Sequence, residues 1–298
     1  MQIFLAFLEN LRPRQWTKNL ILFAGVIFAQ LFGTPAYVIQ AGLGVLVFCL
    51  ASGAVYIYND AADVELDRLH PYKRLRPIAS GRLPIRLAFY LAGLLMVACL
   101  FAAYLLGSNF CIVTGVFFLH NIIYTRLLKR AVILDVVGIA FSFVIRAVAS
   151  VEVLREVVPS IHISNWLLLC TFFLSLFLGF GKRRHEVINV QPSGRKTRPA
   201  LASYSEPLLN VMIGITFALT LMAYSLYTVW PGTIAHFGTN KLVYTLPFVF
   251  YGMGRYLFLV YKEGRGGRPH EILLNDVALQ LGVGGWIASV ILIIGLHA

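Results

Sequence analysis

The sequence predicts an all-α protein, a polytopic membrane bundle of about nine transmembrane helices. Of its 298 residues, 59% are hydrophobic and only 13% are charged, which is typical of a membrane protein. The apolar residues also gather into long runs, and a membrane span needs about 20 such residues. Nine runs reach or approach that length, at 19–33, 37–58, 87–106, 110–127, 132–151, 164–181, 207–230, 242–261 and 277–296.

The segments between these runs contain no composition break, so we expect one membrane-embedded domain over 1–298. The residues before the first run lead into a basic stretch and do not resemble a signal peptide. We expect an interfacial helix there, with Trp16 at the headgroup level. The loops 59–86 and 182–206 both open on ionisable residues and continue into an Arg-Pro pair, which suggests an internal repeat of about four spans.

The positive charge is distributed unevenly along the chain. The net charge is +12, and nearly all Lys and Arg residues precede the first run or lie in the loops after the second, fourth, sixth and eighth runs. By the positive-inside rule these segments face the cytoplasm. We therefore expect a multi-pass protein of the cell (inner) membrane, with its N-terminus and active site on the cytoplasmic side. Its surroundings are membrane lipids and not nucleic acid.

Residues 59–67 read Asn-Asp-Ala-Ala-Asp-Val-Glu-Leu-Asp and directly follow an apolar run whose helix would continue through them. On that helix Asp60, Asp63 and Asp67 lie within about 60° of one another. Stacked carboxylates repel each other, and Mg²⁺ removes the repulsion while it binds substrate phosphates. Asn59 adds a neutral oxygen or an amide donor. The pattern predicts a catalytic Mg²⁺ site; the alternative is a solvated acidic helix end.

A basic segment follows this acidic stripe directly and contains Lys73, Arg74 and Arg76. A Mg²⁺-diphosphate needs such a pairing, because the metal binds one side of the phosphates and Lys or Arg binds the other. Alone, the segment would read as a membrane anchor. Beside the carboxylates, it indicates a diphosphate-bearing substrate.

The pattern Asn-Asp-x-x-Asp-x-x-x-Asp after the second of nine apolar runs resembles the UbiA superfamily of intramembrane prenyltransferases. Members that prenylate aromatic acceptors carry a second motif, Asp-x-x-x-Asp, after the sixth span. Here that place reads Gly-Lys-Arg-Arg-His-Glu, from Gly181 to Glu186, so one carboxylate stands among basic residues. This departure is similar to one branch, the decaprenyl-phosphate phosphoribosyltransferases. That branch also resembles the chain at 12–19, 70–81, 181–183 and 271–274.

The resemblance implies transfer of 5-phosphoribosyl from phosphoribosyl diphosphate to a polyprenyl phosphate, releasing diphosphate, as a step towards lipid-linked pentose donors for the cell envelope. This reaction involves more phosphate groups than prenyl transfer does, so it needs more cations. Substrate-binding candidates are Lys18, Asn59, Lys73, Arg74, Arg76, Arg126, Lys129, Arg146, Lys182, Arg183, Glu186, Arg198 and Tyr204.

Several of these candidates have structural alternatives. Lys182 and Glu186 also suit a helix ion pair, and Tyr204 also suits the interface belt. Arg146, at membrane depth, would bind the lipid phosphate or neutralise a structural carboxylate. For the whole chain, prenyl transfer from a polyprenyl diphosphate is the second enzymatic hypothesis. A transporter or lipid-binding scaffold is the non-enzymatic one, and a homo-oligomer is compatible with each.

Overall fold

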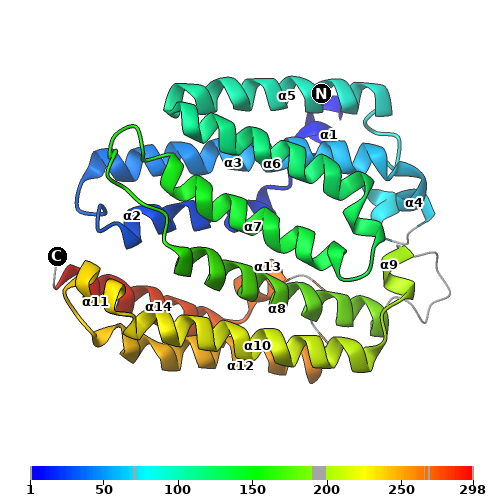
Figure 1. Cartoon of the computed structure of the whole chain (residues 1–298). Coiled ribbons are helices and arrows are strands. Elements are labelled where there is room, and N and C mark those ends of the chain that lie inside the picture. The colour runs from blue at the N-terminus through cyan, green and yellow to red at the C-terminus, as the bar shows by residue number, and fades with distance from the viewer. Residues whose placement is uncertain (1, 70–71, 190–198, 265, 268, 297–298) are drawn as a thin grey trace. The chain divides into compact units, whose positions relative to one another are not determined.

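The computed structural model describes residues 2–69, 72–189, 199–264, 266–267 and 269–296. The described residues form helices joined by turns and loops, with no strand among them, so the predicted all-α class is confirmed. The chain divides into two compact units (Figure 1). The first comprises Met1–Gly138, Val144–Ile163 and Gly194–Ala200, and the second comprises Ile139–Phe143, Ser164–Ser193 and Leu201–Ala298.

Eight helical segments in the described part of the chain are long and apolar enough to cross a membrane. They match the second to ninth predicted runs and confirm a multi-pass membrane bundle. Their bounds are Pro35–Ala62, Ile85–Leu106, Ser108–Arg130, Leu134–Glu152, Asn165–Ile188, Glu206–Val229, Lys241–Tyr261 and Val277–Gly295.

The first predicted run, 19–33, does not form a long α-helix. Pro13–Phe23 form a 3-10 helix, η1, and Ala24–Phe28 form the short helix α2. Gly25 of α2 packs closely against the neighbouring backbone, since a Cβ there would lie 2.0 Å from the carbonyl oxygen of Ser150. A 3-10 helix also rises about 2.0 Å per residue, against about 1.5 Å in an α-helix, so it covers more distance with fewer residues.

The first unit is organised around helix α3 (Pro35–Ala62), which packs against η1, α5 and α6. Phe48 of α3 contacts Phe110 and Phe117 of α6, with ring centroids 5.6 and 5.2 Å apart. Burial of these aromatic rings ties α3 to its neighbours. The remaining elements are α1 (Gln2–Asn10), α4 (Val64–Leu69), η2 (Lys73–Leu75), α5 (Ile85–Leu106), α6 (Ser108–Arg126), η3 (Leu128–Arg130) and α7 (Leu134–Glu152).

In the second unit α8 packs against α10, and α12 packs against both α10 and α14. Asp276 fixes the start of α14, since its carboxylate accepts from the backbone N–H of Leu279 at 2.8 Å and binds Arg255 at 2.8 and 3.2 Å. The elements beyond α7 are α8 (Asn165–Asn189), α9 (Pro199–Ala202), α10 (Glu206–Val229), α11 (Pro231–Phe237), η5 (Lys241–Thr245), α12 (Leu246–Tyr261), α13 (Pro269–Asn275) and α14 (Val277–Gly295).

Candidate functional site

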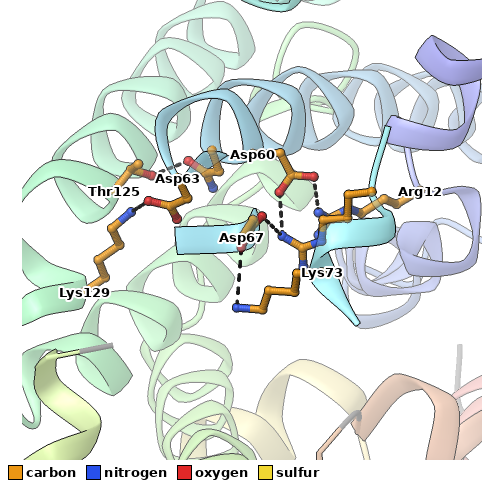
Figure 2. Close-up of polar contacts among 9 residues, drawn as sticks. Arg12, Asp60, Asp63, Asp67, Lys73, Thr125 and Lys129 are labelled. Atoms are coloured by element: carbon orange, nitrogen blue, oxygen red, sulfur yellow. Dashed lines mark hydrogen bonds and ion pairs between the residues drawn. The ribbon is translucent and has the colours of Figure 1, made fainter. Parts of the chain in front are cut away.

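The predicted acidic stripe lies where α3 ends. The helix stops at Ala62, and Asp63 is its C-cap with φ −103° and ψ 10° before α4 begins. Helical backbone hydrogen bonds nevertheless continue across this break. The N–H of Asp63 donates to the Asn59 carbonyl and that of Asp67 donates to the Asp63 carbonyl, both at 2.9 Å. This local distortion divides the carboxylates: Asp60 and Asp67 face one set of basic groups, whereas Asp63 turns towards Lys129 (Figure 2).

Asp60 and Asp67 converge on one guanidinium nitrogen. Nη1 of Arg76 lies 2.9 Å from Oδ1 of Asp60 and 2.6 Å from Oδ2 of Asp67. The carboxylate side chains are only 5% and 4% exposed. Arg12 also donates to Asp60, and Nζ of Lys73 lies 3.8 Å from Oδ1 of Asp67. The predicted repulsion is thus relieved by cations from segments before and after the stripe.

Asp67 is a buried carboxyl group with two cations beside it. Burial raises its pKa above the ordinary value, and the neighbouring Arg76 and Lys73 act in the opposite direction. Arg76 and Lys73 thus favour the ionised form of Asp67, against the effect of its burial.

Asn59 lies against Thr125 of α6. The Thr125 hydroxyl contacts the Asn59 side chain and also donates to the Asn121 carbonyl at 2.8 Å. The Asn59 atom that faces the hydroxyl is Oδ1, which can only accept, so Thr125 is the donor and its single proton is shared between the oxygens of Asn59 and Asn121. Thr125 thereby fixes the orientation of the Asn59 amide.

A metal ion can be tested against this donor set. No group of three or more His, Cys, Asp or Glu side chains close enough to hold a metal occurs among the described residues, so Asp60, Asp63 and Asp67 do not meet as one cluster. Asp60 and Asp67 do converge on a single point. Mg²⁺ is commonly held by one or two carboxylates together with substrate phosphates. The pair, with Asn59 beside it, fits that requirement.

Arg146 is buried in the interior of the first unit, and Lys18 is half-buried. Arg146 is 5% exposed and donates to Asn19 at 2.8 Å and Ser52 at 3.1 Å, both neutral partners. Nζ of Lys18 donates to Gln15 at 2.9 Å. Burial, with the nearby charges of Arg146 and Arg12, lowers the Lys18 pKa to about 7. This region therefore favours an anion.

Arg74 and Arg126 are the other predicted cations of the first unit that the structure describes. Arg74 is exposed on η2, and Nε of Arg126 donates to the Tyr58 hydroxyl at 3.0 Å. Arg198 lies outside the described residues. Nothing in these contacts assigns Arg74 or Arg126 to a substrate.

The predicted second cluster lies at the end of α8 in the second unit. Arg183, whose side chain is 1% exposed, binds Glu186 at 2.5 Å within the same helix. Lys182 is half-buried, and Tyr204 is buried. The described part of α8 thus replaces two expected carboxylates with one Arg-Glu pair.

Arg12 and Thr125 are site residues that the sequence did not identify. Arg12 has a left-handed backbone (φ 51°) between α1 and Pro13, which turns the chain towards α3. Gly53 permits the approach, because a Cβ there would lie 2.6 Å from a methyl carbon of Leu11. Arg12 lies in the basic stretch before the first apolar run, and this is the sequence feature that could have identified it as a site residue. No sequence signal marked Thr125.

Comparison with known proteins extends over nearly the whole chain. The model of the UbiA prenyltransferase family matches residues 19–269. The decaprenyl-phosphate phosphoribosyltransferase of Mycolicibacterium smegmatis is 32% identical over 95% of this chain and 90% of the relative. That of Mycobacterium tuberculosis is 33% identical over 95% and 92%. A UbiA homologue from Archaeoglobus fulgidus, solved with GPP and Mg²⁺, shares the fold with a TM-score of 0.72 at 19% identity, covering 97% of this chain and 99% of the homologue.

Proposed function

The chain belongs to the UbiA prenyltransferase family, and we propose that it is a membrane phosphoribosyltransferase. It transfers the 5-phosphoribosyl group of phosphoribosyl diphosphate to a polyprenyl phosphate and releases diphosphate. The observation that carries the proposal is the convergence of Asp60 and Asp67 on one cation position, with Arg12, Lys73 and Arg76 around it. Relatives similar over almost their full length bear the name of this activity.

The carboxylate pair, with Asn59, would hold Mg²⁺, and the metal when bound would withdraw charge from the leaving diphosphate. Cationic side chains of the protein bind the phosphate groups. Arg76 and Lys73, both within reach of the pair, hold phosphate oxygens on the side away from the carboxylates. Lys129 anchors Asp63 and directs it away from them. Asp63 therefore supports the site electrostatically.

The acceptor phosphate attacks C1 of the ribose as the bond to diphosphate breaks. A phosphate monoester is already ionised near neutral pH, so no side chain has to remove a proton from it. The protein contributes orientation and charge stabilisation. Lys18 and Arg146 in the first unit, and Lys182 and Arg183 in the second, are proposed phosphate ligands.

We further propose that the protein lies in the cell (inner) membrane with the carboxylate end of α3 facing the cytoplasm, where phosphoribosyl diphosphate is available. The basic loops favour this orientation. The whole chain, 1–298, acts as one transferase domain. Its product would feed the synthesis of lipid-linked pentose donors for cell-envelope glycan.

Two reaction mixtures test the function. The purified protein in lipid nanodiscs receives ribose-labelled phosphoribosyl diphosphate with polyprenyl phosphate and Mg²⁺, or labelled polyprenyl diphosphate with an aromatic acceptor. We expect labelled lipid in the first mixture, none when a chelator removes the metal, and no prenylated product in the second. Product in the second mixture alone would identify a prenyltransferase. Product in neither would favour a transporter or a lipid scaffold.

A further inference from the structure

Arg76 occupies the point at which the two metal-binding carboxylates converge. We propose that Arg76 is a placeholder cation: it holds Asp60 and Asp67 together, gives up this place to the metal ion, and then binds the diphosphate that arrives with the metal. This inference rests on the proposed function. It makes metal binding and diphosphate binding cooperative through one side chain.

The geometry makes the two cations mutually exclusive. A single nitrogen, Nη1 of Arg76, is within hydrogen-bond distance of both carboxylates, at 2.9 Å from Asp60 and 2.6 Å from Asp67. Mg²⁺ binds carboxylate oxygens at about 2.0–2.1 Å. A metal bound by the same two oxygens would overlap the guanidinium group. Arg76 must leave when both oxygens become metal ligands.

The rest of the site keeps its structure when Arg76 leaves. Arg12 remains on the other oxygen of Asp60, and Lys73 remains near the other oxygen of Asp67. Departure of Arg76 thus frees Oδ1 of one carboxylate and Oδ2 of the other. These are the two oxygens that already face each other across one point.

The backbone around Arg76 is anchored, so the movement is confined to its side chain. The N–H of Arg76 donates to the Lys73 carbonyl at 3.0 Å, and its own carbonyl accepts from Ser80 at 2.9 Å. Ile78 and Leu83, just beyond, are completely buried. The Arg76 side chain is 29% exposed and has several rotatable bonds. It therefore remains beside the metal position after displacement.

The consequence is a reciprocal coupling between two ligands. Metal binding releases a guanidinium group suited to two phosphate oxygens, and diphosphate binding draws that group away from the carboxylates. Each ligand then raises the affinity of the other by the same factor. Without diphosphate the metal has to displace an ion pair, so its affinity is low.

The test measures Mn²⁺ binding to the full chain in nanodiscs by the EPR signal of free Mn²⁺, with and without inorganic diphosphate. Arg76→Met should tighten Mn²⁺ binding without diphosphate about tenfold, and diphosphate should then tighten it further by much less than in the wild type. Arg76→Gln should change Mn²⁺ binding in the same way as Arg76→Met. Melting temperatures establish that each variant is folded.

Lys73→Met is the matched control, because Lys73 also places a positive charge near Asp67 but does not lie between the carboxylates. It should tighten Mn²⁺ binding much less than Arg76→Met. Equal effects of the two substitutions, or weaker Mn²⁺ binding in both Arg76 variants, would overturn the proposal. If the wild type binds no Mn²⁺ even with diphosphate, the metal-dependent function itself fails, which is a different result.

Discussion

The ends of α3 and α8 carry the two ionisable clusters of the molecule, and they are built differently. At the end of α3, Asp60, Asp63 and Asp67 bind cations from three separate segments: the turn before η1, the stretch around η2, and η3. At the end of α8, Glu186 binds Arg183 of its own helix. An ion pair between separate segments can exchange partners when a ligand arrives. A pair between residues of one helix instead stabilises that helix. In the proposed function, the first cluster holds the metal and the second binds phosphate.

The largest expected effect comes from removing a carboxylate of the α3 cluster. Asp60→Asn or Asp67→Asn should reduce kcat/KM about a thousandfold, because the metal loses one of two convergent charged ligands. Initial rates of labelled lipid formation measure this. Glu65→Gln is the control, since Glu65 lies beside them on α4 but is exposed and pairs with Arg68 at 3.1 Å. A loss no greater than that of the control would remove the distinction between the two clusters.

A smaller effect, on binding, is expected from the α8 cluster. Lys182→Gln should raise the KM for phosphoribosyl diphosphate about tenfold while kcat changes little, since a phosphate loses one charged partner. Lys262→Gln, an exposed lysine after α12, should leave both constants unchanged. A fall in kcat and kcat/KM together would instead give the α8 cluster a role in the transition state.

The sequence predicts most of the membrane helices and the shared position of Asp60 and Asp67, but not the other contacts of the site. Eight of nine predicted runs became membrane helices, because length and hydrophobicity alone decide that property. The run at 19–33 forms η1 and the short α2 instead of one long helix, which its hydrophobicity alone does not predict.

The spacing of Asp60 and Asp67 indicated their shared position. The separation of Asp63 could not be foreseen, since it depends on a helix end and on Lys129, 66 residues away. The contacts of Arg12 and Thr125 are equally non-local.

A pH dependence is expected from Lys18. Its pKa near 7 means that it loses its charge between about pH 6 and 8, so the KM for phosphoribosyl diphosphate should rise several-fold over that interval. Lys18→Arg keeps its charge and should flatten the profile. The same depressed pKa makes the fold more stable as pH rises from about 7 towards the ordinary lysine value of 10.5. A wild-type KM profile that matches that of Lys18→Arg would exclude Lys18 from the phosphate site.

The smallest effect is expected at Thr125, which acts through Asn59. Thr125→Val should raise the Mg²⁺ concentration for half-maximal activity a few-fold, because the Asn59 side chain loses the hydroxyl donor that orients it. Thr125→Ser keeps the hydroxyl and should restore the wild-type value. If valine and serine give the same Mg²⁺ requirement, the hydroxyl does not orient Asn59.

The most direct test of the account follows two phosphorus labels in one reaction. Phosphoribosyl diphosphate labelled with ³²P in the 5-phosphate, or separately in the β-phosphate, is incubated with the protein, polyprenyl phosphate and Mg²⁺. The account predicts that the 5-phosphate label enters the lipid and that the β-label leaves as diphosphate at the same rate, with both rates collapsing in Asp60→Asn. Retention of the β-label in the lipid, or transfer that survives Asp60→Asn, would contradict it.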